Sequence, residues 1–275
     1  MEASINKDTQ LCMSLAGRPG NFGTRFHNFL YRELGLNFVY KAFTTRDLPG
    51  AITGIRALGI RGCAVSMPFK EACIEFLDEL TSSARGLMSV NTIVNDEGRL
   101  TAYNTDYIAV ASLLQSRRVS ADLAFALRGS GGMAKAVACA LKDAGFHQGT
   151  IVARNEKTGR ALAEQYGFAW QAELPDQSTF GLLVNVTPIG MAGGAEADHL
   201  SFPESAIRAA EFVFDVVALP PETPLIRMAN ALGKPAISGA EVIELQAVEQ
   251  FVLYTGVRPE PELIARAAAF ARQSA

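Results

Sequence analysis

The chain has 275 residues, of which 49% are hydrophobic and 19% are charged, and its formal net charge is −3. This composition is typical of a globular protein with a sizeable core, and it excludes a disordered tail, a collagen-like repeat and a coiled-coil rod. With 25 basic and 28 acidic residues, the charge is too balanced for a nucleic-acid-binding surface.

Strands and helices alternate along the first half of the chain, which predicts an α/β unit. A hairpin turn is expected at 95–98, inside a β-rich stretch. The other expected elements are strands at 10–16, 37–43 and 62–67, and helices at 22–34, 47–58, about 70–80 and about 106–117.

The alternation restarts near residue 121, and this restart predicts a second domain. We expect domains at 1–105 and 106–239, with the helices of 240–275 packing back onto the first domain. In the second half, strands are expected at 123–127, 150–153, 182–186, 212–216 and 235–237, and helices at 133–144 and from 241 onward.

The cysteines and the apolar runs exclude several further classes. Four cysteines without CxxC spacing, and only three histidines, predict neither a disulfide framework nor a metal site, and they favour a reducing compartment. The N-terminal residues are polar, and no apolar run approaches the ~20 residues that a membrane-spanning helix needs. We therefore expect a cytoplasmic protein without membrane contact.

A glycine-rich turn is the strongest local motif. It has the pattern G-x-G-x-x-A between a strand and a helix, and it consists of Gly129, Ser130, Gly131, Gly132, Met133 and Ala134. In such a motif the first glycine permits the tight turn, the second lets a pyrophosphate approach the backbone, and the alanine allows close packing. The motif predicts a doubly wound, Rossmann-type dinucleotide-binding domain. The alternative is a turn that only connects two elements.

The end of the next strand bears on the choice of cofactor. NAD-binding domains usually carry an acidic residue there for the ribose hydroxyls, whereas this chain has Arg154 followed by Asn155. The planar guanidinium of an arginine suits a 2′-phosphate, and Lys157 adds positive charge. This pattern favours NADP over NAD. In the alternative, Arg154 is a solvated loop residue and Glu156 binds the ribose.

Several motifs occur together and in order. They are AVSMPFK at 64–70, SVNTI at 89–93, NTD at 104–106, the glycine-rich turn, Arg154, NVTPIGM at 185–191, Gly239, and LQA at 245–247. With this set the chain resembles the shikimate/quinate dehydrogenase family, and most closely its shikimate dehydrogenase-like branch. The resemblance extends over nearly the whole chain.

The resemblance implies NADP-dependent oxidation and reduction of a ring hydroxyl in a small molecule such as shikimate or quinate, by a monomer or homodimer. It also implies that the first domain binds substrate. Lys70 and Asp106 match the catalytic pair, and Asn21, Ser66, Asn91 and Gln246 fall at substrate-binding positions. Thr187 and Gly239 belong to motifs near the cofactor.

The residue types fit this chemistry, because oxidising an alcohol requires a side chain that takes the hydroxyl proton. Lys70 or Asp106 could accept it, and the pattern assigns the proton to neither. The simpler alternatives are a solvated lysine and a helix-capping aspartate. Apolar residues surround Gln246 on its expected helix, which predicts a buried amide bonded to a substrate hydroxyl or to a backbone carbonyl.

Two features depart from the family pattern. The early S-x-S pair, which holds the substrate carboxylate in the family, is replaced by Asn21 and Gly23, so that Asn21, Thr24 or Arg25 would have to bind it. A tyrosine near the substrate is replaced by Ala218. These departures leave two alternatives: a dehydrogenase for an aminoshikimate-type acid, and an NADP(H)-binding sensor without turnover.

Overall fold

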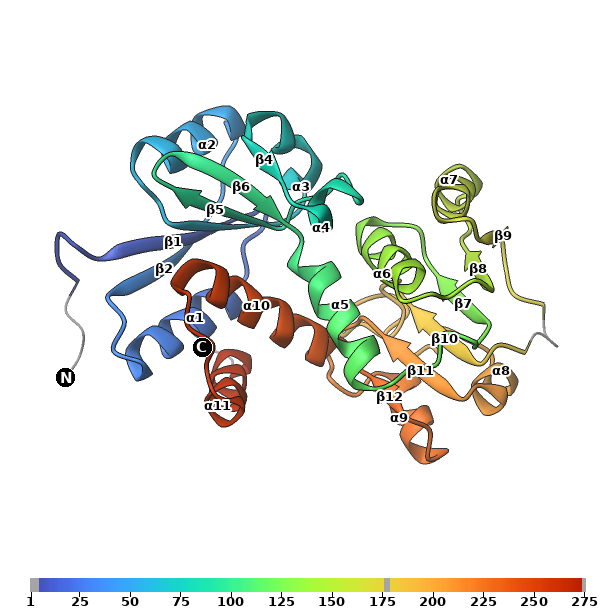
Figure 1. Cartoon of the computed structure of the whole chain (residues 1–275). Coiled ribbons are helices and arrows are strands. Elements are labelled where there is room, and N and C mark those ends of the chain that lie inside the picture. Colours follow the sequence, from blue (N-terminus) through green and yellow to red (C-terminus); the bar gives the residue numbers. More distant parts are fainter. Residues whose placement is uncertain (1–4, 176–178, 274–275) are drawn as a thin grey trace. The chain divides into compact units, whose positions relative to one another are not determined.

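The computed structural model describes residues 5–175 and 179–273, and it divides into two compact units (Figure 1). One unit consists of Met1–Thr105 with Glu244–Ala275, and the other of Asp106–Ile243. Each unit contains one six-stranded sheet with helices packed on it. The predicted α/β fold class is therefore confirmed.

The sheet of the first unit is mixed, with strand order β2-β1-β3-β5-β6-β4. Strands β1, β2 and β3 are parallel, whereas β5 runs antiparallel to both β3 and β6. The predicted hairpin is confirmed: Glu97 and Gly98 form its two-residue loop, and both have positive φ. The strands are β1 (Gln10–Leu15), β2 (Phe38–Phe43), β3 (Gly62–Val65), β4 (Glu79–Leu80), β5 (Thr92–Asp96) and β6 (Arg99–Tyr103).

Helices cover both faces of this sheet. Successive side chains of β1 point to opposite sides, and apolar residues on both sides need to be covered. Cys12 belongs to a hydrophobic cluster with α1, α10 and α11, and Met13 belongs to a second cluster with α2. Figure 1 shows α1 and α2 on opposite sides of β1. The helices are α1 (Phe22–Glu33), α2 (Leu48–Ala57), α3 (Phe69–Ala72), the 3-10 turn Ile74–Phe76, α4 (Ser82–Arg85), α10 (Gly239–Thr255) and α11 (Pro261–Arg272).

The predicted helix at 70–80 is wrong. Only α3 and the short turn Ile74–Phe76 are helical, and the chain becomes extended at Leu77. The Asp78 amide donates to Leu100 O at 3.0 Å, and β4 pairs in parallel with β6. Pairing with a strand 22 residues away in the sequence thus overrides the local preference for a helix.

The sheet of the second unit is parallel throughout, with order β12-β11-β10-β7-β8-β9. Numbered from β7, this is the doubly wound order 3-2-1-4-5-6, and the winding reverses between β7 and β10. The predicted Rossmann-type architecture is confirmed. The strands are β7 (Phe125–Arg128), β8 (Gly149–Val152), β9 (Ala169–Gln171), β10 (Leu182–Asn185), β11 (Phe212–Asp215) and β12 (Ala236–Ile237).

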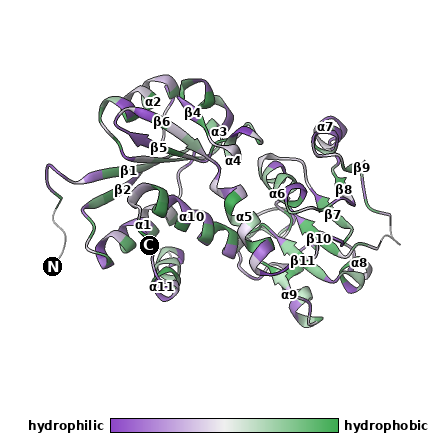
Figure 2. Ribbon diagram, viewed as in Figure 1, coloured by the Kyte–Doolittle hydropathy of each residue, from purple (hydrophilic) through white to green (hydrophobic). Residues whose placement is uncertain are grey.

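The central strands β7, β10 and β11 are almost entirely buried, and Figure 2 shows β10 and β11 as hydrophobic. In the part of the chain that the structure describes, no helix has both the length and the apolar character needed to cross a bilayer. The remaining helices are α5 (Thr105–Ser116), α6 (Gly132–Asp143), α7 (Glu156–Tyr166), α8 (Glu204–Ala209) and α9 (Pro224–Ala231).

Candidate functional site

The glycine-rich turn has the geometry that a bound pyrophosphate requires. Gly129 has φ +123°, and a Cβ atom there would lie 2.8 Å from Val186 Cγ2. Gly131 and Gly132 instead face open space, with no heavy atom within 4 Å of an added Cβ. Because α6 begins at Gly132, its first amides are free to donate to an anion. These residues fit a dinucleotide.

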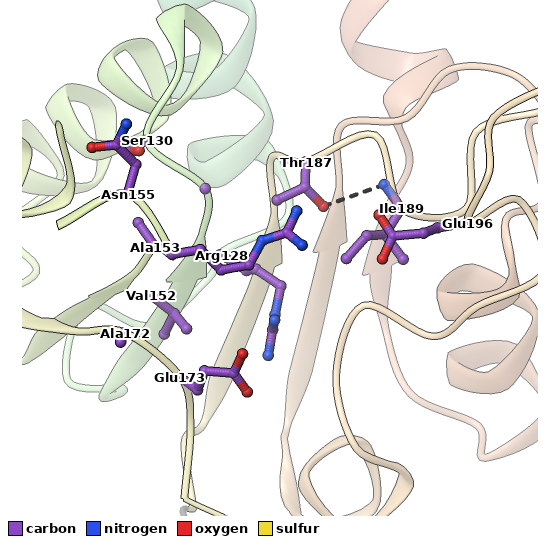
Figure 3. Close-up of a pocket in the computed structure, with 12 residues that line it drawn as sticks. Arg128, Ser130, Val152, Ala153, Asn155, Ala172, Glu173, Thr187, Ile189 and Glu196 are labelled. Carbon is purple, nitrogen blue, oxygen red and sulfur yellow. Dashed lines mark hydrogen bonds between the residues drawn. The ribbon is translucent and has the colours of Figure 1, made fainter.

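A cavity of about 390 Å³ lies next to this turn (Figure 3). It is formed at the carboxyl ends of β7, β8 and β10, where the winding of the sheet reverses, which is the usual binding place in this architecture. Five predicted cofactor residues line it, namely Gly129, Ser130, Arg154, Asn155 and Thr187.

The other predicted cofactor residues do not line this cavity. Ala134 is buried in α6, and a Cβ at Gly239 would lie 2.3 Å from Val216 O, so both are small because other groups pack against them. Lys157 is exposed on the first turn of α7. Gly131 and Gly132 are exposed and Met133 is half-buried.

A hydrogen-bond network fixes the loop that carries Thr187. Its hydroxyl donates to Asn185 Oδ1 at 2.6 Å. The same hydroxyl accepts from the Ile189 amide at 3.3 Å, and Figure 3 shows this bond. Asn185 Nδ2 in turn donates to Asp215 Oδ1 at 2.9 Å. Burial raises the pKa of Asp215, and hydrogen bonds from Thr223, the Val217 amide and Asn185 oppose that shift. The network holds the cavity wall after β10.

The side chains after β8 differ in what they contact. Arg154 lines the cavity, whereas the Glu156 carboxylate accepts a hydrogen bond from Arg160 at 2.8 Å, one turn along α7. Asn155 Oδ1 accepts from the Thr158 amide at 3.1 Å and thereby caps α7. The basic residue thus faces the cavity, and the acidic residue is paired outside it.

Several residues that line the cavity were not predicted, namely Arg128, Val152, Ala153, Ala172, Glu173, Ile189 and Glu196. Arg128 had a signal in the sequence, because it is a charged residue at the end of an apolar strand, directly before Gly129. Glu173 and Glu196 lie in irregular segments whose course the sequence does not fix. Within the described residues, no three His, Cys, Asp or Glu side chains are grouped as metal ligands.

Asn91 is the most strongly fixed of the predicted substrate residues. It is 3% exposed, and its Oδ1 accepts from the Thr105 amide at 2.7 Å and from the Thr92 hydroxyl at 2.9 Å. Because backbone amides only donate, this bond fixes the orientation of the Asn91 side-chain amide. Its Nδ2 has no partner among the residues that the structure describes. The Asn91 amide is therefore a pre-oriented donor.

The two predicted catalytic residues start from backbone positions tied to this same segment. Lys70 is the second residue of α3, and its carbonyl accepts from the Val90 amide at 2.8 Å. Asp106 is the second residue of α5 and directly follows Thr105, whose amide is bound by Asn91. Both side chains are half-buried.

The expected burial of Gln246 is wrong. Gln246 is only half-buried, and its Oε1 accepts a long hydrogen bond of 3.4 Å from Thr105 Oγ1. The buried amide on α10 is Gln250, one turn later, which is 5% exposed and donates to Thr92 Oγ1 at 3.0 Å. Because apolar residues occur all around this helix, the sequence pattern does not show which glutamine faces the core.

The three candidates for binding a carboxylate differ in what they contact. The Arg25 guanidinium donates to Phe270 O at 2.9 Å and lies 4.3 Å from the centre of the Phe270 ring. The Thr24 hydroxyl is buried. Asn21 is exposed at the start of α1, and its side chain makes no capping hydrogen bond. Ser66 is also exposed, in the turn between β3 and α3.

Comparison with known proteins places the chain in a family. Residues 22–93 match the family model of the shikimate dehydrogenase substrate binding domain. The chain is 62% identical over 268 residues to a shikimate dehydrogenase-like protein of Haemophilus influenzae, with 98% of each chain covered. A solved shikimate 5-dehydrogenase-like protein has a TM-score of 0.96 at 61% identity, with 98% of this chain and 100% of that chain covered.

A more distant structure is that of the Thermus thermophilus shikimate 5-dehydrogenase in complex with NADP(H) and shikimate. It has a TM-score of 0.82 at 29% identity, and the match covers 95% of this chain and 100% of that chain. The likeness therefore extends over both units and is carried by sequence as well as by fold. The chain belongs to the shikimate dehydrogenase family.

Proposed function

We propose that this protein is an NADP-dependent dehydrogenase that interconverts a ring hydroxyl and a ring ketone in a shikimate-like cyclic acid. The observation that carries the proposal is the double attachment at Val90–Asn91. The Val90 amide holds the carbonyl of Lys70, and the Asn91 side chain holds the amide of Thr105, directly before Asp106. One short segment thus fixes the backbone from which each proposed catalytic residue extends.

NADP, when bound, supplies the hydride acceptor. Support for this cofactor comes from Arg154 in the cavity, from Glu156 being paired elsewhere, and from the NADP(H) named for the Thermus relative. A guanidinium is a strong partner for a 2′-phosphate, because both charges strengthen the hydrogen bonds. NAD lacks that phosphate and loses this contact.

The protein's own residues bind the alcohol and handle its proton. Asn91 Nδ2 donates to a substrate hydroxyl, and Gln246 and Ser66 offer further polar contacts. The hydroxyl proton passes to the pair Lys70 and Asp106, and it returns from them in the reduction. Asn21 takes the substrate carboxylate, since Arg25 is bound to Phe270 and the Thr24 hydroxyl is buried.

An absorbance assay of NADPH tests this proposal. The purified protein is given shikimate, quinate, an aminoshikimate and their 3-dehydro forms, with NADP and with NAD. We expect turnover of shikimate with NADP, and we expect Lys70→Ala to lower kcat by at least ~100-fold while the Kd for NADPH stays unchanged. Lys7→Ala, an exposed lysine of the same unit, is the matched control.

Other outcomes separate the alternatives. Turnover of the aminoshikimate alone would replace the substrate and keep the chemistry. NADPH binding without turnover of any compound, in the wild type as in Lys70→Ala, would mean an NADP(H) sensor.

A further inference from the structure

The cofactor cavity has four charged side chains on its wall, and they are not paired with one another. Arg128, Arg154, Glu173 and Glu196 all line it. None of these four side chains forms a hydrogen bond or an ion pair with any residue in the described part of the chain. Arg128 and Glu196 are half-buried, whereas Arg154 and Glu173 are exposed. The cost of an unpaired charge therefore falls mainly on Arg128 and Glu196. The arrangement points to a charged ligand.

Arg128 is the less expected of the two arginines. It ends β7, is half-buried, and its guanidinium carbon lies 5.4 Å from the centre of the Phe202 ring. Its Nε is shielded from solvent and has no hydrogen-bond partner among the described residues. Burial lowers the pKa of Arg128. The charge of Glu173 opposes this lowering, and the charge of Arg154 adds to it. The two guanidinium groups are thus close enough to repel each other.

We propose that Arg128 is a second guanidinium for the 2′-phosphate of NADP and that it sets the preference for NADP together with Arg154. This inference rests on the proposed function. A phosphate dianion near both arginines replaces their repulsion with attraction and supplies acceptors for the terminal guanidinium nitrogens of Arg128. A ribose hydroxyl, as in NAD, carries no charge and does neither.

The two carboxylates make Arg128 necessary for this role. With both arginines present, the four side chains carry no net charge, so a dianion can approach. Without Arg128, one cation faces Glu173 and Glu196, and this wall repels a phosphate. Replacing Glu196 by glutamine makes the net charge of this wall more positive and should favour binding of the phosphate.

Calorimetric titration of the full-length protein at pH 8, where the 2′-phosphate is a dianion, tests the inference. The ligands are NADPH, NADH, adenosine 2′-monophosphate and adenosine 5′-monophosphate. For Arg128→Met we expect at least ~10-fold weaker binding of NADPH and of adenosine 2′-monophosphate, and less than ~2-fold change for the other two. Arg128→Lys should fall between, because it keeps the charge and loses the planar fork. Glu196→Gln should lower the Kd for NADPH.

Two results would overturn the inference. Equally weakened binding of NADPH and NADH in both Arg128 variants would mean that the side chain contacts the adenine or only stabilises the fold. Unchanged affinities would remove it from the site. A wild-type protein that binds no NADPH would instead contradict the proposed function, so the two failures are distinguishable.

Discussion

Gln250 and Thr92 are joined by a buried hydrogen bond of 3.0 Å, although they lie 158 positions apart in the chain. Thr92 Oγ1 accepts from Gln250 Nε2 and itself donates to Asn91 Oδ1 at 2.9 Å. Helix α10 thereby supports the residue that we propose to bind substrate. Because this support leads to the proposed substrate residue, its loss should affect substrate binding more than cofactor binding.

Replacing Gln250 by leucine should therefore destabilise the first unit and raise KM. Gln250 also donates to Asn91 O at 3.3 Å, and leaving these buried acceptors without their donor costs about 1–3 kcal/mol. Urea unfolding followed by circular dichroism measures this change, and titration should give an unaltered Kd for NADPH. Gln115→Leu, at an exposed position of α5, should change stability by less than about 0.5 kcal/mol. A normal KM in Gln250→Leu would contradict the supporting role.

Thr223 connects the cofactor loop to the core of the second unit. Its hydroxyl donates to Asp215 Oδ2 at 2.6 Å and accepts from the Ile226 amide at the start of α9. Thr223→Val loses the helix cap and a bond to a carboxylate, which together cost about 2–4 kcal/mol. Thr223→Ser keeps both bonds and should stay within about 1 kcal/mol of wild type. Trp170, the one tryptophan of the chain, lies in β9 and reports unfolding of this unit by its fluorescence. Equal loss in both variants would mean that the methyl group matters, not the hydroxyl.

Gly62 lies where β3 passes under the ring of Tyr254. A Cβ atom at Gly62 would be 2.2 Å from Tyr254 Cδ1, and Tyr254 is fully buried. Gly62→Ala should therefore destabilise the first unit by about 1–3 kcal/mol or more, because the ring has to move. Gly54, in helix α2 with no atom within 4 Å of an added Cβ, is the control, and Gly54→Ala should stabilise by up to about 1 kcal/mol. Thermal unfolding compares the two, and equal shifts in Tm would contradict this packing argument.

The parts of the fold that follow from local patterns were predictable, and those that depend on distant pairing were not. The turn at Gly129 has a fixed sequence pattern and the predicted geometry. The segment after Lys70 has helical residues, yet Asp78 and β4 bond to β6, and no local pattern shows that contact. The same holds for the site: Arg154 follows a predicted strand, whereas Glu196 reaches the cavity through an irregular loop.

His27 makes the stability of the first unit depend on pH. It is fully buried, and it stacks on Tyr40 with ring centres 4.5 Å apart. Burial lowers its pKa from 6.5 to about 3, and Gln250 opposes this only in part. The surrounding tyrosines Tyr31, Tyr40 and Tyr254 have raised pKa values and do not titrate in acid.

Between pH 6.5 and 3 the unfolded chain binds a proton at His27 that the folded chain does not. The stability from this group is therefore complete above pH 6.5 and falls as the pH decreases, by up to about 1.4 kcal/mol per pH unit. Between pH 7 and pH 5, urea unfolding of the wild type should lose about 2 kcal/mol more than that of His27→Phe, which keeps an aromatic ring and has no proton to bind. Parallel pH profiles of the two proteins would show that His27 binds its proton over the same pH range in the folded chain as in the unfolded chain.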